Sequence, residues 1–305
     1  MKKQMAKVVS AVLVLLAGAW GYLAAEGDGA QVVFLDVGQG DATFIRAPEG
    51  QVALIDGGRG QARLEELLEE LGMRPGEPID VMIASHADFD HIGGLVGAAE
   101  TFPPRNFMDN SVPHSTQAYA NLLEAVDAAG SRLLEPTRRR INLGSVRLEI
   151  LPPPLRNDEQ NDNSIGVVVH HGTFTVFIAG DATEDTQTYW RETYPEAFNG
   201  IEVYRSAHHG SDTGDRPAFL QFLAPELVVV SVGESNPYGH PTPEAMASYA
   251  SVTNSILRTD EVGHIAVATA GSGHFGYEVA TGVLEAVPSV DIVALLTGVL
   301  ETFGL

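Results

Sequence analysis

The sequence predicts an α/β fold with four layers, an αββα sandwich in which two β-sheets lie face to face and helices cover both outer surfaces. Short β-rich runs alternate with helical runs in both halves of the chain, and the two halves share one layout. No glycine-rich phosphate loop opens a predicted helix, which argues against a doubly wound nucleotide-binding fold. With 305 residues, 44% of them hydrophobic, the chain can bury a large core.

Two sequence periods assign the individual elements. Short apolar and β-branched runs bounded by turn residues predict strands over 31–36, 41–46, 51–56, 79–84, 145–151, 165–171, 173–179, 201–207 and 226–232. Apolar residues at helical spacing predict helices over 62–71, 95–102, 116–129, 182–194 and 216–223. Gly72 stands where the helix over 62–71 should end, because glycine commonly follows a helix C-terminus.

Both ends of the chain are expected to lie outside this domain, which we assign to residues 30–282. Three lysines precede an uncharged, apolar stretch over 8–25, a pattern typical of a signal peptide. The stretch is also long enough to be retained as a membrane anchor, so residues 1–25 are predicted to be one or the other. Either way we expect an exported protein, secreted, periplasmic or anchored to the outer face of the cytoplasmic membrane. Residues 283–305 are expected to form an amphipathic helical tail that packs on the core or contacts a membrane or partner.

The composition limits the binding partners and the metal ligands that the chain can use. The formal net charge is −22, from 40 acidic and 18 basic residues, and loss of the three lysines in residues 1–25 would leave −25. Such a charge works against non-specific binding to nucleic acid or anionic lipid. The chain has no cysteine, so a transition-metal site must use nitrogen or oxygen ligands.

A metal site is predicted directly after the apolar run over 79–84. Within six positions the chain carries His86, Asp88, Asp90 and His91, followed by two glycines. A loop at the end of a rigid strand lets such side chains converge, and their spacing is hard to explain as a solvated surface.

Three more segments at predicted strand ends carry candidate ligands. Asp181 ends one strand, His208 and His209 follow another, and Asn163 precedes a third. Taken alone, Asp181 suits an ordinary turn, and Ser211 could cap a helix beside two surface histidines. Delivered together to one edge of a sandwich, these groups would hold two ions with one bridging carboxylate, for which Asp181 is the natural candidate.

Over residues 31–279 the sequence resembles the metallo-β-lactamase superfamily, and within it the exported domain of ComEC-type competence proteins. The resemblance implies the αββα metallo-β-lactamase sandwich. The commoner superfamily motif has histidine where this chain has Asp88, and the ComEC-type branch has aspartate there. The motifs occur in the family's order, at 34–42 (FLDVGQGDA), 54–58 (LIDGG), 86–94 (HADFDHIGG), 163–164 (NS), 180–181 (GD), 208–211 (HHGS) and 238–241 (YGHP).

The resemblance implies a division of the ligands between two ions. His86 and Asp88 would serve one ion, Asp90 and His91 the other, and Asp181 would bridge them. Oxygen-rich ligation at the first ion moves the expected metal from zinc toward manganese, so two divalent ions, Zn or Mn, are predicted.

Further residues are expected around this centre. The resemblance implies that His209 completes the second ion's shell, with His208 as the alternative. It places Asn163 near where many members supply another histidine, and it implies that buried Asp56 orients the ligand loop. Ser211 is expected at the substrate or behind the ligands.

The implied reaction is hydrolysis by a metal-bound hydroxide, in which Asp90 takes or relays a proton. His240 is expected to act as an acid or phosphate contact, or else to be only a turn residue before Pro241. The resemblance implies a phosphodiester substrate, with DNA first. A carboxylic ester, a lactone, a phosphocholine group and a non-catalytic binding function are the alternatives.

The acidic chain offers one candidate basic patch for DNA. This patch would be formed by Arg138, Arg139 and Arg140, with Arg156 and Arg205 nearby. A run of three arginines is, however, more typical of a solvated loop.

Overall fold

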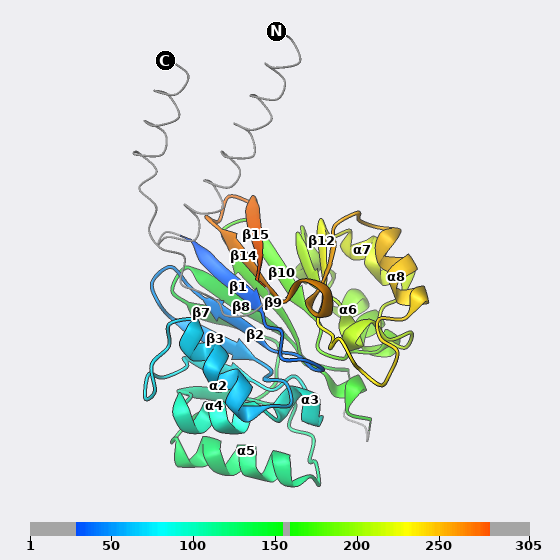
Figure 1. Cartoon of the computed structure of the whole chain (residues 1–305). Coiled ribbons are helices and arrows are strands. Elements are labelled where there is room, and N and C mark those ends of the chain that lie inside the picture. Colours follow the sequence, from blue (N-terminus) through cyan, green and yellow to red (C-terminus); the bar gives the residue numbers. More distant parts are fainter. Residues whose placement is uncertain (1–28, 155–158, 281–305) are drawn as a thin grey trace, which may run out of the picture.

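Strands with apolar side chains on both faces form the centre of the molecule. In the computed structural model, which describes residues 29–154 and 159–280, strand β3 (Val52–Ile55) shows the pattern clearly. Ala53 and Ile55 pack into the core between two sheets, whereas Val52 and Leu54 pack under helices. Burial on both faces favours continuous apolar runs over strict alternation of polar and apolar residues. The predicted αββα sandwich is confirmed (Figure 1).

The first sheet has eight strands in the order β15-β14-β1-β2-β3-β4-β5-β6. β1 pairs antiparallel with β2 on one side and with β14 on the other, while β3 to β6 run parallel. The other strands of this sheet are β1 (Ala30–Phe34), β2 (Thr43–Arg46), β4 (Val81–Ile83), β5 (Asn106–Met108), β6 (Arg132–Leu133), β14 (His264–Thr269) and β15 (Phe275–Ala280).

The second sheet has seven strands in the order β13-β12-β11-β10-β9-β8-β7. β10 to β13 are parallel, and β7 to β9 form an antiparallel extension. The strands are β7 (Arg139–Leu143), β8 (Val146–Leu151), β9 (Gly166–His171), β10 (Phe174–Ile178), β11 (Val203–Arg205), β12 (Leu227–Val230) and β13 (Ile256–Arg258).

Helices form the two outer layers and bury apolar side chains against the sheets. Leu64, Leu67 and Leu68 of α2 pack on the first sheet with α4 and α5, and Trp190 of α6 packs on the second with α7 and α8 (Figure 1). The helices are α2 (Gln61–Glu70), α3 (Phe89–Ile92), α4 (Leu95–Thr101), α5 (Gln117–Ala128), α6 (Glu184–Thr193), α7 (Pro217–Leu223), α8 (Pro243–Ala250) and α9 (Thr259–Val262). None of the helices in residues 29–154 and 159–280 combines the length and apolar character needed to cross a bilayer.

Two features of the fold differ from the sequence prediction. The arginine run does not form a solvated loop. Arg139 begins β7, and Arg138 pairs with buried Glu149 of the adjacent strand. In addition, the sequence did not predict the strands β5, β6, β7, β13, β14 and β15, and the last two of these join the first sheet, where β14 lies beside β1. Residues 1–25 and 283–305, and Arg156 of the expected basic patch, lie outside the described residues.

The loops that follow β3, β4, β10, β11 and β12 gather at one edge of the sandwich. These strands are parallel to their neighbours, and the carboxyl ends of parallel strands meet at the same edge of a sheet. The segments predicted to carry metal ligands start at these strand ends.

Candidate metal centre

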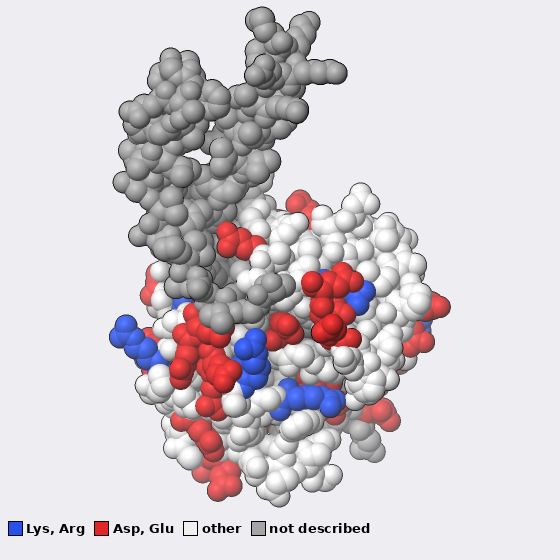
Figure 2. Space-filling view, viewed as in Figure 1, with Lys and Arg blue, Asp and Glu red and all other residues white. Residues whose placement is uncertain are grey.

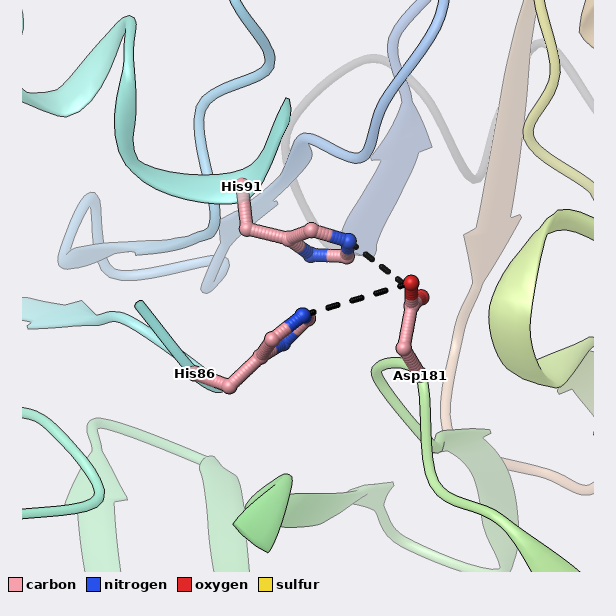
Figure 3. A group of neighbouring side chains, drawn as sticks. All are labelled: His86, His91 and Asp181. Carbon is pink, nitrogen blue, oxygen red and sulfur yellow. Dashed lines mark ion pairs between the residues drawn. The ribbon is translucent and has the colours of Figure 1, made fainter. Parts of the chain in front are cut away.

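The histidines of the loop after β4 face a carboxylate supplied by the other sheet. His86 lies on this loop, His91 lies in the single turn of α3, and Asp181 follows β10. Figure 3 shows both imidazole rings directed at the Asp181 carboxylate, which lies 3.2 Å from His91 Nε2 and 4.0 Å from His86 Nε2. All three residues are buried. Two segments almost a hundred residues apart in the chain therefore form one cluster.

The loop after β11 adds a third imidazole. His209 is buried, and its Nε2 atom lies 3.5 Å from Asp181 Oδ2 and 3.7 Å from Asp90 Oδ2. Its neighbour His208 is partly exposed, and its Nε2 atom is 3.9 Å from Asp181 Oδ2 and 3.4 Å from Asn161 Nδ2. Of the two histidines, His209 is therefore better placed to complete the cluster.

The backbone of this loop is held in an unusual conformation. His208 and His209 have φ angles of 50° and 53°, in the left-handed region that L-residues rarely occupy. Buried Asp215 anchors the loop by accepting a hydrogen bond from the Ala207 backbone N–H at 3.0 Å. Backbone strain of this kind is characteristic of functional sites, where the surrounding structure stabilises it.

Each buried imidazole of the cluster uses its Nδ1 atom for a hydrogen bond within the protein. His91 Nδ1–H donates to Asp56 at 2.9 Å, and His209 Nδ1–H donates to the Ser231 carbonyl at 3.0 Å. Ser85 Oγ donates to Asp56 at 2.7 Å, so it can accept from His86 Nδ1–H at 3.1 Å. These bonds assign the proton to Nδ1 and leave the Nε2 lone pair for an incoming cation.

The residues of the cluster fit the metal centre that this arrangement suggests. Among the described residues, the Nε2 atoms of His86, His91 and His209 and Asp181 Oδ1 are buried with no hydrogen-bond partner. Leaving such atoms unsatisfied is costly in a protein interior, and imidazole nitrogen with carboxylate oxygen is a donor set for Zn or Mn. Ligand atoms within 4.8 Å of one another form the groups His86/His91/Asp181 and Asp90/His91/His209.

The charges in the cluster favour cation binding. Burial opposes ionisation of Asp181, but the imidazoles of His209 and His91 hold the pKa of this carboxyl well below its usual value. Burial likewise opposes protonation of His91, but the carboxylates of Asp181 and Asp56 raise its pKa well above the ordinary value. A proton on His91 therefore occupies the position that a cation would take.

Two of the predicted ligands lie nearer to solvent. The side chain of Asp88 is 39% exposed, with its Oδ2 atom 3.5 Å from His86 Nε2, and the interaction with His86 lowers the pKa of Asp88. The Asp90 side chain is less exposed, and its Oδ2 atom is 3.7 Å from Arg59 Nη2. The two aspartates thus lie on the solvent side of the histidines, where a substrate would approach.

Asp56 occupies the position expected of a residue that orients the ligands. Its carboxylate accepts hydrogen bonds from the Ser85 backbone N–H at 2.7 Å, from Ser85 Oγ and from His91. Its own φ angle is 58°, so the backbone is also in the left-handed region. One buried carboxylate therefore fixes the start of the ligand loop and one of its imidazoles.

Two charged residues of the centre were not expected as site residues. Asp41 is buried, with carboxylate oxygens 3.8 Å from His91 Nδ1 and 3.7 Å from His209 Nδ1. It forms an ion pair with Arg205, whose Nη1 also donates to the Gly180 carbonyl at 2.8 Å. The assignment of Arg205 to a surface patch was therefore wrong, because its side chain is fully buried under the cluster, where burial lowers its pKa to about 9.

The other predicted site residues lie at the periphery. Asn163 is buried and donates to the Glu159 carbonyl at 2.6 Å, while its neighbour Ser164 accepts from the Asp181 backbone N–H at 3.2 Å. Ser211 accepts a hydrogen bond from the Thr213 backbone N–H at 3.2 Å and so shapes the turn after His209.

His240 lies on the loop after β12. Its ring centroid is 5.8 Å from that of His208, and burial lowers the pKa of His240, with His208 adding to this effect. The ring is therefore neutral at pH 7. It can donate a hydrogen bond to a phosphate but is a weak source of protons.

Comparison with known proteins places this geometry in a family. The family model for the metallo-beta-lactamase superfamily matches residues 35–234, more than half of the chain. The chain belongs to this superfamily. Membership supports a metal-dependent hydrolase with divalent ions at the cluster described above.

Within the superfamily, the chain is similar to ComEC-like competence proteins. It is 24% identical over 264 residues to ComE operon protein 3 of Bacillus subtilis (strain 168), an alignment that covers 80% of this chain and 33% of that protein. It is 27% identical over 242 residues to Recombination protein 2 of Haemophilus influenzae, covering 78% of this chain and 28% of that protein. The chain thus spans about a third of the length of these relatives.

A solved structure with the same fold belongs to a hydroxylase rather than a hydrolase. CmlA, a diiron beta-hydroxylase from Streptomyces venezuelae, superposes with a TM-score of 0.51 at 15% identity, covering 79% of this chain and 54% of that chain. The metallo-beta-lactamase fold therefore does not by itself specify the reaction, which must be argued from the site.

Proposed function

We propose that this chain is an exported hydrolase that uses two divalent ions, Zn or Mn, to cleave phosphodiester bonds, in particular those of DNA during uptake. One observation carries the proposal. Three buried Nε2 atoms, from His86, His91 and His209, converge on the carboxylate of Asp181, and none of them has a hydrogen-bond partner among the described residues. Such an arrangement suits one carboxylate shared between two cations.

The ligand atoms divide into two groups around Asp181. The first ion would be held by the more exposed group and the second by the more buried one. The first group is His86, Asp88 and Asp181, and the second is Asp90, His91, His209 and Asp181. His208 lies outside both groups.

Bound ions of this kind supply activated water and neutralise the charge that develops on the phosphorus substituents. The protein supplies the proton acceptor, because the Asp90 carboxylate lies beside His209 at the solvent side of the centre. His240, held in place by a hydrogen bond from its backbone N–H to Asn236 Oδ1 at 3.0 Å, can donate an N–H to a substrate oxygen. Asp56 keeps His91 in the tautomer that presents Nε2.

The choice of DNA rests on the competence relatives, and the charge of the chain constrains how DNA would bind. On the face in Figure 2, acidic side chains are widespread and basic side chains occur in a few small groups. The net charge of −22 disfavours a long electrostatic track for duplex DNA. A substrate that engages mainly the ions and a few nearby side chains fits this surface better, so single strands are favoured over duplexes.

The test is a substrate panel with the metal-loaded full chain. We expect metal-dependent cleavage of bis-p-nitrophenyl phosphate and of a single-stranded oligonucleotide, lost on chelation and restored by Zn or Mn. Elemental analysis should find two ions per chain. Asp181→Ala and His86→Ala should abolish turnover, whereas Asp127→Ala, on the exposed face of α5, should retain it.

Other outcomes would change the assignment. Cleavage of p-nitrophenyl butyrate, a lactone or a phosphocholine ester with none of the phosphodiesters would move the chain to the corresponding hydrolase class. Absence of a bound divalent ion would contradict any metal-dependent reaction. Cell fractionation would test export, and recovery only in the cytoplasm would contradict that part of the proposal.

A further inference from the structure

A hydrogen bond joins the two halves of the sandwich beside the metal centre. Arg59 lies on the loop between β3 and α2, and Tyr238 lies on the loop between β12 and α8. Arg59 Nη2 donates to Tyr238 Oη at 3.0 Å, although the residues are 179 positions apart in the chain. The two loops leave different sheets, so the pair spans the boundary between them.

Both residues are connected to the centre through direct contacts. Arg59 Nη2 lies 3.7 Å from Asp90 Oδ2. The Tyr238 ring stacks on His240 with centroids 5.8 Å apart and planes at 18°, and His240 lies next to His208. Each member of the pair is thus adjacent to a side chain of the solvent side of the centre.

The pair is open to solvent, unlike the cluster beneath it. The Arg59 side chain is 43% exposed and Tyr238 is 54% exposed. A guanidinium carries five N–H donors, and the contacts of Arg59 with Tyr238 and Asp90 both involve Nη2. A tyrosine ring that is stacked on one face offers its other face to a planar group.

We infer that Arg59 and Tyr238 form a nucleotide subsite, in which Arg59 binds a phosphate oxygen and Tyr238 stacks on the adjacent base. This inference rests on the proposed phosphodiesterase function and narrows its substrate to single-stranded DNA, because bases of a duplex are not free to stack on a side chain. Arginine suits phosphate for its charge and its fork of donors, and an aromatic ring binds any base without sequence preference.

A purely structural role is the competing explanation, since the hydrogen bond could serve only to hold two loops together. The two roles differ in which atoms matter. Tyr238→Phe removes the hydroxyl and its bond to Arg59 but keeps the ring, whereas Tyr238→Ala removes both. A structural bridge predicts that the two variants behave alike on every substrate. A stacking role predicts that they differ, and only on substrates with a base.

The experiment compares a single-stranded thymidine oligonucleotide with an abasic oligonucleotide of the same length, using the metal-loaded full chain. The wild type should bind the base-bearing strand about tenfold more tightly, as measured by fluorescence anisotropy and by KM. Tyr238→Phe should retain this preference and Tyr238→Ala should lose it, with kcat changed little. Arg59→Ala should raise KM for both strands. Tyr277→Ala, at an exposed position on β15, should change neither.

The outcomes separate the subsite from the reaction. If neither strand is cleaved but the binding preference exists and is lost in Tyr238→Ala, the subsite stands and the proposed reaction fails. If strands are cleaved with no base preference, or Tyr238→Ala keeps the preference, the subsite is wrong and the proposed reaction stands. Equal losses in Tyr238→Phe and Tyr238→Ala on both strands would show a structural bridge and overturn the inference.

Discussion

Replacing Asp56 by asparagine should weaken metal binding without touching a metal ligand. The carboxylate accepts three hydrogen bonds, from Ser85 N–H, Ser85 Oγ and His91 Nδ1–H. Asparagine has the same shape and tolerates the left-handed backbone at φ 58°, so the substitution changes mainly the hydrogen bonding. The amide NH₂ would face donors, and it would favour His91 with its proton on Nε2, the atom that the metal requires.

The expected loss of metal affinity follows from the role of Asp56 as the hydrogen-bond partner that orients His91. Loss of such an orienting partner typically lowers metal affinity about 10- to 100-fold, which corresponds to about 1.4 to 2.8 kcal/mol. Competition titration with a chromogenic zinc chelator would measure the affinity, and circular dichroism would check the fold.

Asp80→Asn provides the matched control. Asp80 accepts from the Val52 backbone N–H at 2.9 Å and pairs with Arg105, at the opposite end of β4 from the centre. The Asp80→Asn variant should lose some stability but keep the metal affinity of the wild type. The reasoning is refuted if Asp56→Asn binds zinc as tightly as the wild type, or if Asp80→Asn loses affinity equally.

Three more predictions follow from the geometry. Because the pKa of His91 is raised, metal binding at pH 7 should release about one proton, which titration calorimetry in buffers of different ionisation enthalpy should detect. If metal binding releases no proton, the raised pKa of His91 is contradicted. Gly40 has a φ angle of +132°, and Gly40→Ala would also place a Cβ 2.2 Å from the Asp90 carbonyl oxygen. This substitution should therefore lower the free energy of unfolding by more than the ~1–3 kcal/mol of backbone strain expected for Gly50→Ala, whose Cβ would contact nothing. Urea unfolding of both variants would compare the two losses. Burial raises the pKa of Asp215 to about 6 from 3.8, so this group stabilises the folded state below pH ~4 and loses that contribution as the pH rises through about 6. The free energy of unfolding of the wild type, relative to that of Asp215→Asn, should therefore fall between about pH 4.5 and 7.5. A difference that stays constant with pH would contradict the raised pKa.

Local sequence patterns were sufficient for most of the sandwich. Each strand and helix that was predicted within the described residues lies within a few residues of its predicted position, because buried β-runs and amphipathic helices are set by nearby residues. The strands β5, β6, β7 and β13 to β15 were not predicted, and β14 and β6 illustrate the physical reasons. β14 is defined by its pairing with β1, on the far side of the sequence, and β6 has only two residues. Non-local pairing leaves little trace in a local window.

The residues of the candidate site likewise fall into those that a local motif predicted and those that it did not. His86 and His91 share a dense local motif, and the structure gathers them with Asp181 as expected. Asp41 was missed because an acid after Gly-Gln-Gly is typical of a turn between strands. Arg205 was misassigned because a lone arginine is usually exposed, whereas here its ion pair with Asp41 and its hydrogen bond to the Gly180 carbonyl make burial tolerable.

The position of β14 has a consequence for how the protein is made. β1 lies in the middle of the first sheet, between β2 and β14, and the Asp36 backbone N–H donates to His264 Nδ1 at 2.9 Å. While the ribosome is still translating the residues before 264, β1 can only be an edge strand with an unpaired row of backbone groups. Edge strands of this kind recruit other chains, so a nascent chain is exposed to misassembly until residues 264–269 have been synthesised. His86 and His91 are thus synthesised early, whereas the first sheet, which positions them, is completed only when β14 pairs with β1.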